Sequence, residues 1–88
     1  MEISVKKPTP EELDELGIKN WSPWECDISI FDWEYSDRET AYVYAGKVKV
    51  RTDSGEVSIE KGDLVTFPKG LKCTWKVEKP LRKVYKFG

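Results

Sequence analysis

The sequence predicts one all-β barrel or sandwich preceded by a single short helix, and three observations support this prediction. From Trp21 onward, apolar residues recur with a period of two, the period of a half-buried strand. Turn-forming residues separate these segments at close spacing, which is typical of antiparallel barrels. The chain has 88 residues, the length of one small domain. We therefore expect a single domain, with an N-terminal arm and short helix in residues 1–20 and the barrel in residues 21–88.

The helix is predicted by its capping residues. Thr9 is a favourable N-cap, Pro10 occupies the first helical position, and Glu12 stands three residues after the cap, which completes a capping box. Gly17 is the expected C-terminal stop, because glycine adopts the left-handed conformation at little cost. The sequence therefore predicts a helix of two turns at most between Thr9 and Gly17.

Seven or eight short strands are predicted, each bounded by turn residues. The first alternating segment runs from Cys26 to Tyr35 and ends at a turn over 36–38. Gly46 is expected to break one strand, and Pro80 is expected to separate the last two because proline cannot donate to a ladder. The remaining strands are expected at residues 39–45, 47–52, 56–60, 64–67, 72–78 and 81–87.

Charge, hydrophobicity and composition indicate which partners and which cellular location to expect. The 15 basic and 16 acidic residues give a formal net charge of −1, which argues against a nucleic-acid partner. No apolar run is long enough for a membrane helix, and no secretion signal is recognisable, so we predict no membrane partner and a cytoplasmic protein with reduced cysteines. The high charged fraction of 35% and the absence of glutamine are typical of hyperthermophile proteins.

Histidine is absent from the whole sequence, and this restricts the chemistry. A Ser-His-Asp or Cys-His nucleophile system is excluded, as is a histidine-based metal site. Any proton transfer near neutral pH would have to use a carboxyl, amine, phenol or thiol group whose pKa is shifted.

A specific spacing of turn residues precedes the predicted strand that contains Cys73. Gly62 is followed by five residues, Pro68, one residue, Gly70, two residues and Cys73. Proline fixes φ and glycine accepts positive φ, so these residues turn the chain sharply at the rim of a barrel. This spacing resembles the second signature of the cupin superfamily, in which a histidine stands where Cys73 stands.

The first cupin signature can be located independently. Glu39 is followed by six residues and Gly46, as in that signature. The signature also has two upstream histidines, whose places fall on Trp33 and Tyr35 with the three-residue spacing. We prefer these positions because they continue an aromatic face. The four-residue spacing gives Asp32 and Glu34.

Together the two signatures cover roughly residues 31–77. The segment 67–75 looks like the small-cupin branch that includes ureidoglycine aminohydrolase-type domains and uncharacterised cupins of hyperthermophilic bacteria. The resemblance implies a cupin-type jelly-roll barrel, a central pocket for a small polar metabolite, a homodimer and aminohydrolase-like chemistry. A cupin metal site has three histidines and one glutamate, and of these only Glu39 is retained. No cofactor follows from the residues themselves, and the candidate ligands for a divalent metal are Glu39 and Cys73.

The candidate catalytic residues are Glu39 as acid or base, Cys73 as ligand or nucleophile, and Tyr35 to orient the substrate. The alternatives are that Glu39 forms a structural ion pair and that Cys73 is only a small buried apolar residue. Trp24, like Trp21, is expected either over the barrel mouth or against a second subunit. The expected pocket lining is Phe31, Trp33, Tyr42, Trp75, Lys83 and Tyr85.

Three functions remain open at this level: a small-molecule enzyme, a metal-free binding module for a small ligand, and a structural or assembly domain in which side chains fill the pocket. In a small barrel, large aromatic residues are needed simply to fill the interior, so their presence alone does not distinguish these functions.

Overall fold

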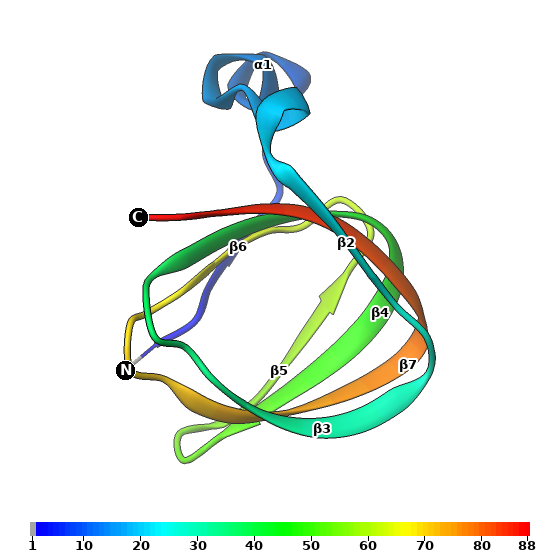
Figure 1. Ribbon diagram of the computed structural model, residues 1–88. Coiled ribbons are helices and arrows are strands. Elements are labelled where there is room, and N and C mark those ends of the chain that lie inside the picture. The colour runs from blue at the N-terminus through cyan, green and yellow to red at the C-terminus, as the bar shows by residue number, and fades with distance from the viewer. Residues whose placement is uncertain (1) are drawn as a thin grey trace.

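The protein is a β-barrel with one short helix outside it (Figure 1). The structure is a computed structural model that describes residues 2–88. It confirms the predicted all-β class. The helices are α1 (Pro10–Leu16) and the 3₁₀ helix η1 (Ile18–Asn20), and the strands are β1 (Ser4–Lys6), β2 (Ser22–Cys26), β3 (Ser29–Glu34), β4 (Glu39–Thr52), β5 (Gly55–Glu60), β6 (Leu64–Phe67) and β7 (Lys72–Phe87).

The seven strands form one antiparallel sheet in the order β1-β6-β4-β7-β2, in which β5 also pairs with β4 and β3 also pairs with β7. The long strands β4 and β7 are the centre of this arrangement, because every other strand except β1 pairs with one or both of them. Figure 1 shows the strands curling around a common centre, with α1 beyond one end of β2. The two long strands therefore fix where the inward-facing residues lie.

Strand β4 continues through Gly46, which corrects the prediction that this residue breaks the strand. Its φ is 97°, and a Cβ there would lie 2.2 Å from the carbonyl oxygen of Pro80 on β7. The register between β4 and β7 shifts on either side of Ala45, which marks a bulge. Gly46 therefore permits a close backbone approach inside one bent strand.

Strand β7 likewise runs through Pro80, although the sequence predicted two strands separated there. Pro80 falls between Lys79 and Arg82, the residues that face the irregular part of β4. The ladder is already interrupted at this point, so a residue without an N–H group is tolerated. Gly46 and Pro80 thus face each other at the point where the pairing between β4 and β7 is interrupted.

The N-terminal region confirms the predicted helix and adds a strand that was not predicted. The Glu12 amide donates to the Thr9 hydroxyl at 3.2 Å, and the Thr9 amide donates to the Glu12 carboxylate at 3.3 Å, so the capping box is complete. Strand β1, only three residues long and too short to show a period, pairs with β6. No helix within residues 2–88 is long and apolar enough to cross a membrane.

The aliphatic core lies between β4, β5 and β7. Val48 pairs with Ile59 on one side and with Val77 on the other, and all three side chains are buried. The alternation of inward and outward residues predicted for these strands is therefore present. Aromatic side chains, described next, line a different part of the interior.

Replacing Gly46 with alanine should destabilise the protein by about 3 kcal/mol or more, because the new Cβ collides with the Pro80 backbone in addition to the strain of positive φ. Urea unfolding would measure the change. Gly55→Ala is the matched control, since φ there is 129° and no atom of residues 2–88 outside its chain neighbours lies within 4 Å of the added Cβ. Equal losses in the two variants would contradict the close-approach role of Gly46.

Candidate functional site

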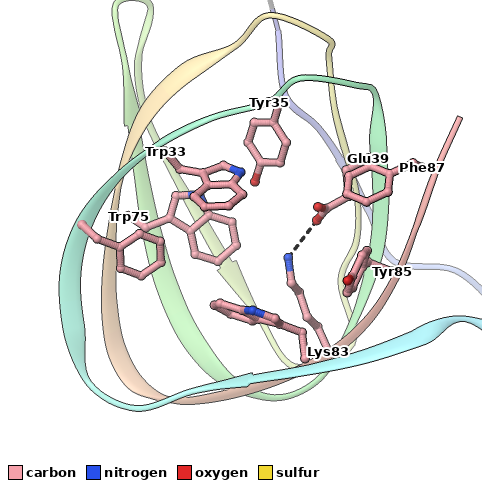
Figure 2. Close-up of a pocket in the computed structure, with 9 residues that line it drawn as sticks. Trp33, Tyr35, Glu39, Trp75, Lys83, Tyr85 and Phe87 are labelled. Atoms are coloured by element: carbon pink, nitrogen blue, oxygen red, sulfur yellow. Dashed lines mark hydrogen bonds and ion pairs between the residues drawn. The ribbon is translucent and has the colours of Figure 1, made fainter.

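The barrel contains a cavity of about 250 Å³ whose walls are mostly aromatic (Figure 2). Strands β2, β3, β4 and β7 and the residue after β3 supply its lining. In Figure 2 the polar ends of Tyr35, Glu39 and Lys83 point toward the same space. The lining residues are Trp24, Phe31, Trp33, Tyr35, Glu39, Trp75, Lys83, Tyr85 and Phe87.

A buried ion pair joins two strands at this cavity. Lys83 Nζ on β7 lies 2.8 Å from Glu39 Oε2 at the start of β4, and their side chains are only 7% and 6% exposed. Both side chains lie on the inward face of their strands. The same face carries the buried residues Ala41 and Val43 on β4 and Leu81 on β7. An uncompensated charge in such a place costs several kcal/mol, so each group depends on the other.

Four aromatic rings surround the Lys83 ammonium group. The distances from Nζ to the ring centroids are 4.8 Å for Trp75, 4.9 Å for Trp24, 5.5 Å for Tyr85 and 5.9 Å for Phe67. The negative faces of such rings attract a cation, and the attraction is strongest where water is excluded. The rings thus replace part of the hydration that the ammonium group loses on burial.

Burial lowers the pKa of Lys83, and the carboxylate of Glu39 opposes part of this effect. Loss of solvent disfavours the charged amine, whereas a carboxylate at hydrogen-bond distance favours it. More of the amine is therefore uncharged near neutral pH than in an exposed lysine. A buried lysine with this tendency is suited to act as a base or a nucleophile.

Two buried polar groups at the cavity, the Tyr35 hydroxyl and the Trp75 indole N–H, lack a hydrogen-bond partner within residues 2–88. Tyr35 is 2% exposed and stacks on Phe67 with ring centroids 4.6 Å apart. Burial raises the pKa of Tyr35, so its phenol stays protonated and can donate. An unsatisfied buried polar group costs about 1–3 kcal/mol, and a ligand with an acceptor atom would recover that cost.

The structure brings most of the predicted site residues together but excludes Tyr42. The expected lining residues Phe31, Trp33, Trp75, Lys83 and Tyr85 all border the cavity. Tyr42, by contrast, lies on the opposite face of β4 from Glu39. Its ring packs edge-on against that of Tyr44, with the ring centroids 5.1 Å apart. Alternation along the strand directs its ring away from the cavity, which corrects the expected lining.

Cys73 also lies outside the cavity lining, although the sequence grouped it with Glu39. Its thiol lies 3.6 Å from the carbonyl oxygen of Trp33, to which it donates a weak hydrogen bond. Burial raises the pKa of Cys73, so the thiol remains protonated at neutral pH. A protonated thiol is a poor nucleophile and a poor metal ligand.

The donor set does not fit a cupin metal centre. Within residues 2–88, no group of three or more histidine, cysteine, aspartate or glutamate side chains could hold a metal ion. Glu39, the retained carboxylate, is paired with Lys83, and tryptophan and tyrosine stand at the two upstream histidine places. We therefore derive no chemical step through a metal.

Trp24 and Phe87 also line the cavity. Phe87 belongs to the set of aromatic residues that the sequence indicated as a possible pocket wall, whereas Trp24 was expected over the barrel mouth or against a second subunit. Trp24 pairs in register with Lys83, and its ring meets Trp75 edge-on with centroids 6.0 Å apart. Its strand is short and contains Pro23, so the sequence pattern did not predict which side of the sheet Trp24 faces. Phe87 lies on the same face of β7 as Lys83 and Tyr85, and the alternation of residues along the strand indicated this position.

An antiparallel barrel with this jelly-roll sheet and a central pocket defines the protein as a cupin-fold domain, as the resemblance implied. More particularly, the chain belongs to the EutQ-like cupin domain family, whose sequence model matches residues 13–85. A curated relative, the acetate kinase EutQ of Clostridioides difficile strain 630, is 32% identical over 77 residues. The match covers 88% of this chain and 47% of the relative, so the chain spans about half the length of that protein.

Solved structures agree with this assignment. A DUF861 family protein from Thermotoga maritima is 53% identical and has a TM-score of 0.96. The match covers 99% of this chain and 100% of that one. The EutQ protein of Clostridium difficile is 27% identical with a TM-score of 0.67, and the match covers 94% of this chain and 64% of that one.

Breaking the ion pair from either side should cost more than removing it altogether. Lys83→Met and Glu39→Leu are each expected to lower the free energy of unfolding at pH 7 by about 3–5 kcal/mol, because each leaves one buried charge alone. The double variant should lie much closer to the wild type. A double-mutant cycle by urea unfolding measures the coupling.

The exposed pair Arg51–Glu56, at 3.7 Å, is the control for this cycle. Its coupling in Arg51→Met and Glu56→Leu should stay below about 1 kcal/mol. A coupling of similar size in both cycles would show that burial does not strengthen the Glu39–Lys83 interaction.

The amine of Lys83 should titrate below the ordinary value of 10.5. Its midpoint can be followed by NMR of the lysine side-chain carbon next to Nζ. Glu39→Gln should lower the midpoint further, because it removes the carboxylate that opposes the burial effect. An unchanged or higher midpoint in this variant would contradict the assigned causes.

Proposed function

We propose that the aromatic cavity binds a small neutral organic molecule with an apolar body and a hydrogen-bond-accepting head, without a metal. The observation that carries this proposal is that Tyr35 and Trp75 hold donors without a partner among residues 2–88, beside the Lys83–Glu39 pair in a cavity whose other walls are apolar. Small-molecule sites typically combine apolar walls with a few placed polar groups.

The charge of the site favours a neutral head group. Glu39 and Lys83 are oppositely charged and 2.8 Å apart, so the pair carries no net charge. An anionic or cationic ligand would add an uncompensated charge against mostly apolar walls, and that is costly. A carbonyl oxygen, as in an amide, aldehyde or ketone, accepts hydrogen bonds without this cost.

The volume favours a molecule about the size of a substituted benzene ring. An engineered apolar cavity of about 150 Å³ binds benzene, and this cavity is about 250 Å³. The Phe31 and Trp75 rings, stacked with centroids 5.9 Å apart, and the half-exposed Trp33 provide flat apolar surface for such a body. Stacked and edge-on contacts between rings add to the area that is buried.

The aminohydrolase-like chemistry implied by the sequence resemblance is a finer proposal for this cavity. Glu39 and Lys83 can exchange a proton, which general acid–base chemistry requires. The metal-dependent form has no support in the donor set. The C. difficile relative is named an acetate kinase, so a carboxylate is the competing class of ligand, which the charge of this site disfavours and which benzoate represents in the test below.

A non-catalytic assembly role is the second candidate, and one surface feature favours it. Ile28 and Ile30 are 65% and 68% exposed, and Ile30 lies on β3, away from the cavity. Exposed large apolar side chains are typical of contact surfaces between proteins. The homodimer and the cytoplasmic location both stay predictions, and sedimentation of the wild type and of Ile30→Lys would test the first.

Benzamide tests the proposed function directly, with benzoate and benzylamine as charged analogues of similar size. We expect benzamide to bind most tightly and to shift the NMR signal of the Trp75 indole N–H, because its carbonyl oxygen accepts from buried donors. Calorimetric titration would measure the affinities. Tighter binding of either charged analogue, or no binding of benzamide at millimolar concentration, would contradict the proposal.

Tyr35→Phe is the matched variant for this experiment. It removes a buried unsatisfied hydroxyl, so it should stabilise the free protein by up to about 1 kcal/mol while weakening benzamide about fivefold. These opposite effects distinguish a ligand-binding hydroxyl from one that only fills space, because a filling role would leave the affinity unchanged.

A further inference from the structure

A primary amine, the Nζ group of Lys83, lines the proposed binding cavity. Lys83 is the one lysine among residues 2–88 that is buried, and its amine forms one hydrogen bond within them, to Glu39. Figure 2 shows Nζ pointing into the space between the labelled Tyr35 and Tyr85. A ligand in this space therefore meets a nucleophilic nitrogen and a carboxyl group together.

We propose that Lys83 adds through Nζ to the carbonyl carbon of a small aldehyde or ketone bound in this cavity and forms a reversible imine. This inference rests on the proposed function, because the carbonyl compound must first bind among the aromatic rings. It deepens that function by naming the class of ligand and the atom that reacts with it.

The step balances without any further reactant. The ammonium of Lys83 first gives a proton to Glu39, and the resulting amine forms a C–N bond with the carbonyl carbon. Glu39 returns its proton to the carbonyl oxygen and then accepts one from nitrogen, which gives a neutral carbinolamine. Glu39 protonates the hydroxyl, the C–O bond breaks, and water leaves. The products are an iminium on Lys83, an ionised Glu39 and one water molecule.

The surroundings of Nζ favour each stage. The rings of Trp24, Trp75 and Tyr85 that attract the ammonium group also attract the iminium cation, because both carry a positive charge. Glu39, 2.8 Å from Nζ, is at the right distance to carry protons between nitrogen and oxygen. The Tyr35 hydroxyl, which has no partner within residues 2–88, can donate to the carbonyl oxygen and polarise it.

A purely structural role for the lysine is the alternative. A buried ion pair is rarely the most stable way to fill a core, and apolar residues of similar volume are often as good or better. A lysine and a glutamate retained here without chemistry would form no adduct. The two readings therefore differ in what the amine does when a carbonyl compound is supplied.

The test is reductive trapping with benzaldehyde and sodium cyanoborohydride at pH 7, followed by peptide mass spectrometry of each lysine. We expect the benzyl adduct to form on Lys83 at least about tenfold faster than on Lys76, an exposed lysine of the same strand, because only Lys83 lies beside Glu39 in the aromatic cavity. Benzamide, which binds but forms no imine, should slow trapping at Lys83 and leave Lys76 unchanged.

Two variants accompany the test, and circular dichroism checks that both are folded. Lys83→Arg keeps a cation beside Glu39 but cannot form an imine, so it should lose this adduct while trapping at Lys76 stays as in the wild type. Glu39→Gln removes the proton carrier and should slow trapping at Lys83, once each rate is divided by the uncharged amine fraction that the NMR titration gives for that protein, while Lys76 reacts as in the wild type.

The outcomes separate this inference from the function on which it rests. Equal trapping of Lys83 and Lys76 in a protein that binds benzamide would overturn the imine and leave the proposed function intact. Failure of the wild type to bind benzamide, with no selective trapping by benzaldehyde, would overturn both.

Discussion

The ion pair between Glu39 and Lys83 is the interaction on which the rest of the interior depends. It joins the first residue of β4 to the later half of β7 across a sequence separation of 44 residues. Both charges are almost completely removed from water, so the pair needs close geometry and favourable neighbours to be tolerated. The aromatic rings around Nζ supply part of that compensation. The aromatic residues of the cavity wall thus help to stabilise the buried charge of Lys83.

The backbone places this pair through one irregularity shared by the two longest strands. Gly46 lets β4 approach Pro80 on β7 more closely than any side chain would allow. A bulge bends a strand and increases its twist, and Figure 1 shows both strands following the curve of the barrel. Because the register shifts at this bulge, it also sets which β7 residues face the start of β4. Barrel closure and the position of Lys83 therefore have a common structural cause.

The cavity has kept the frame of a cupin while its chemistry differs from that of a metal-binding one. Glu39 stands where the cupin pattern has its glutamate, but an amine and aromatic rings surround it in place of imidazoles. A carboxylate beside a cation cannot also serve a divalent metal without losing that partner. Over the described part of the chain, the resulting site has one acid–base pair, two donors without a hydrogen-bond partner, and mostly apolar walls. Such a set suits organic carbonyl compounds better than metal-assisted hydrolysis.

The sequence by itself determined the local features of this protein. Capping residues predicted α1, turn residues and the period of two predicted most strands, and the signature spacings around Glu39 and Gly62 indicated the cupin frame. The absence of histidine already excluded the usual metal site. Only the tertiary structure decided that Lys83 is the partner of Glu39, that Trp24 joins the wall, and that Cys73 and Tyr42 do not. Those facts depend on strand register and bulges between distant segments, and a period of two gives the face of each residue without its neighbours across the sheet.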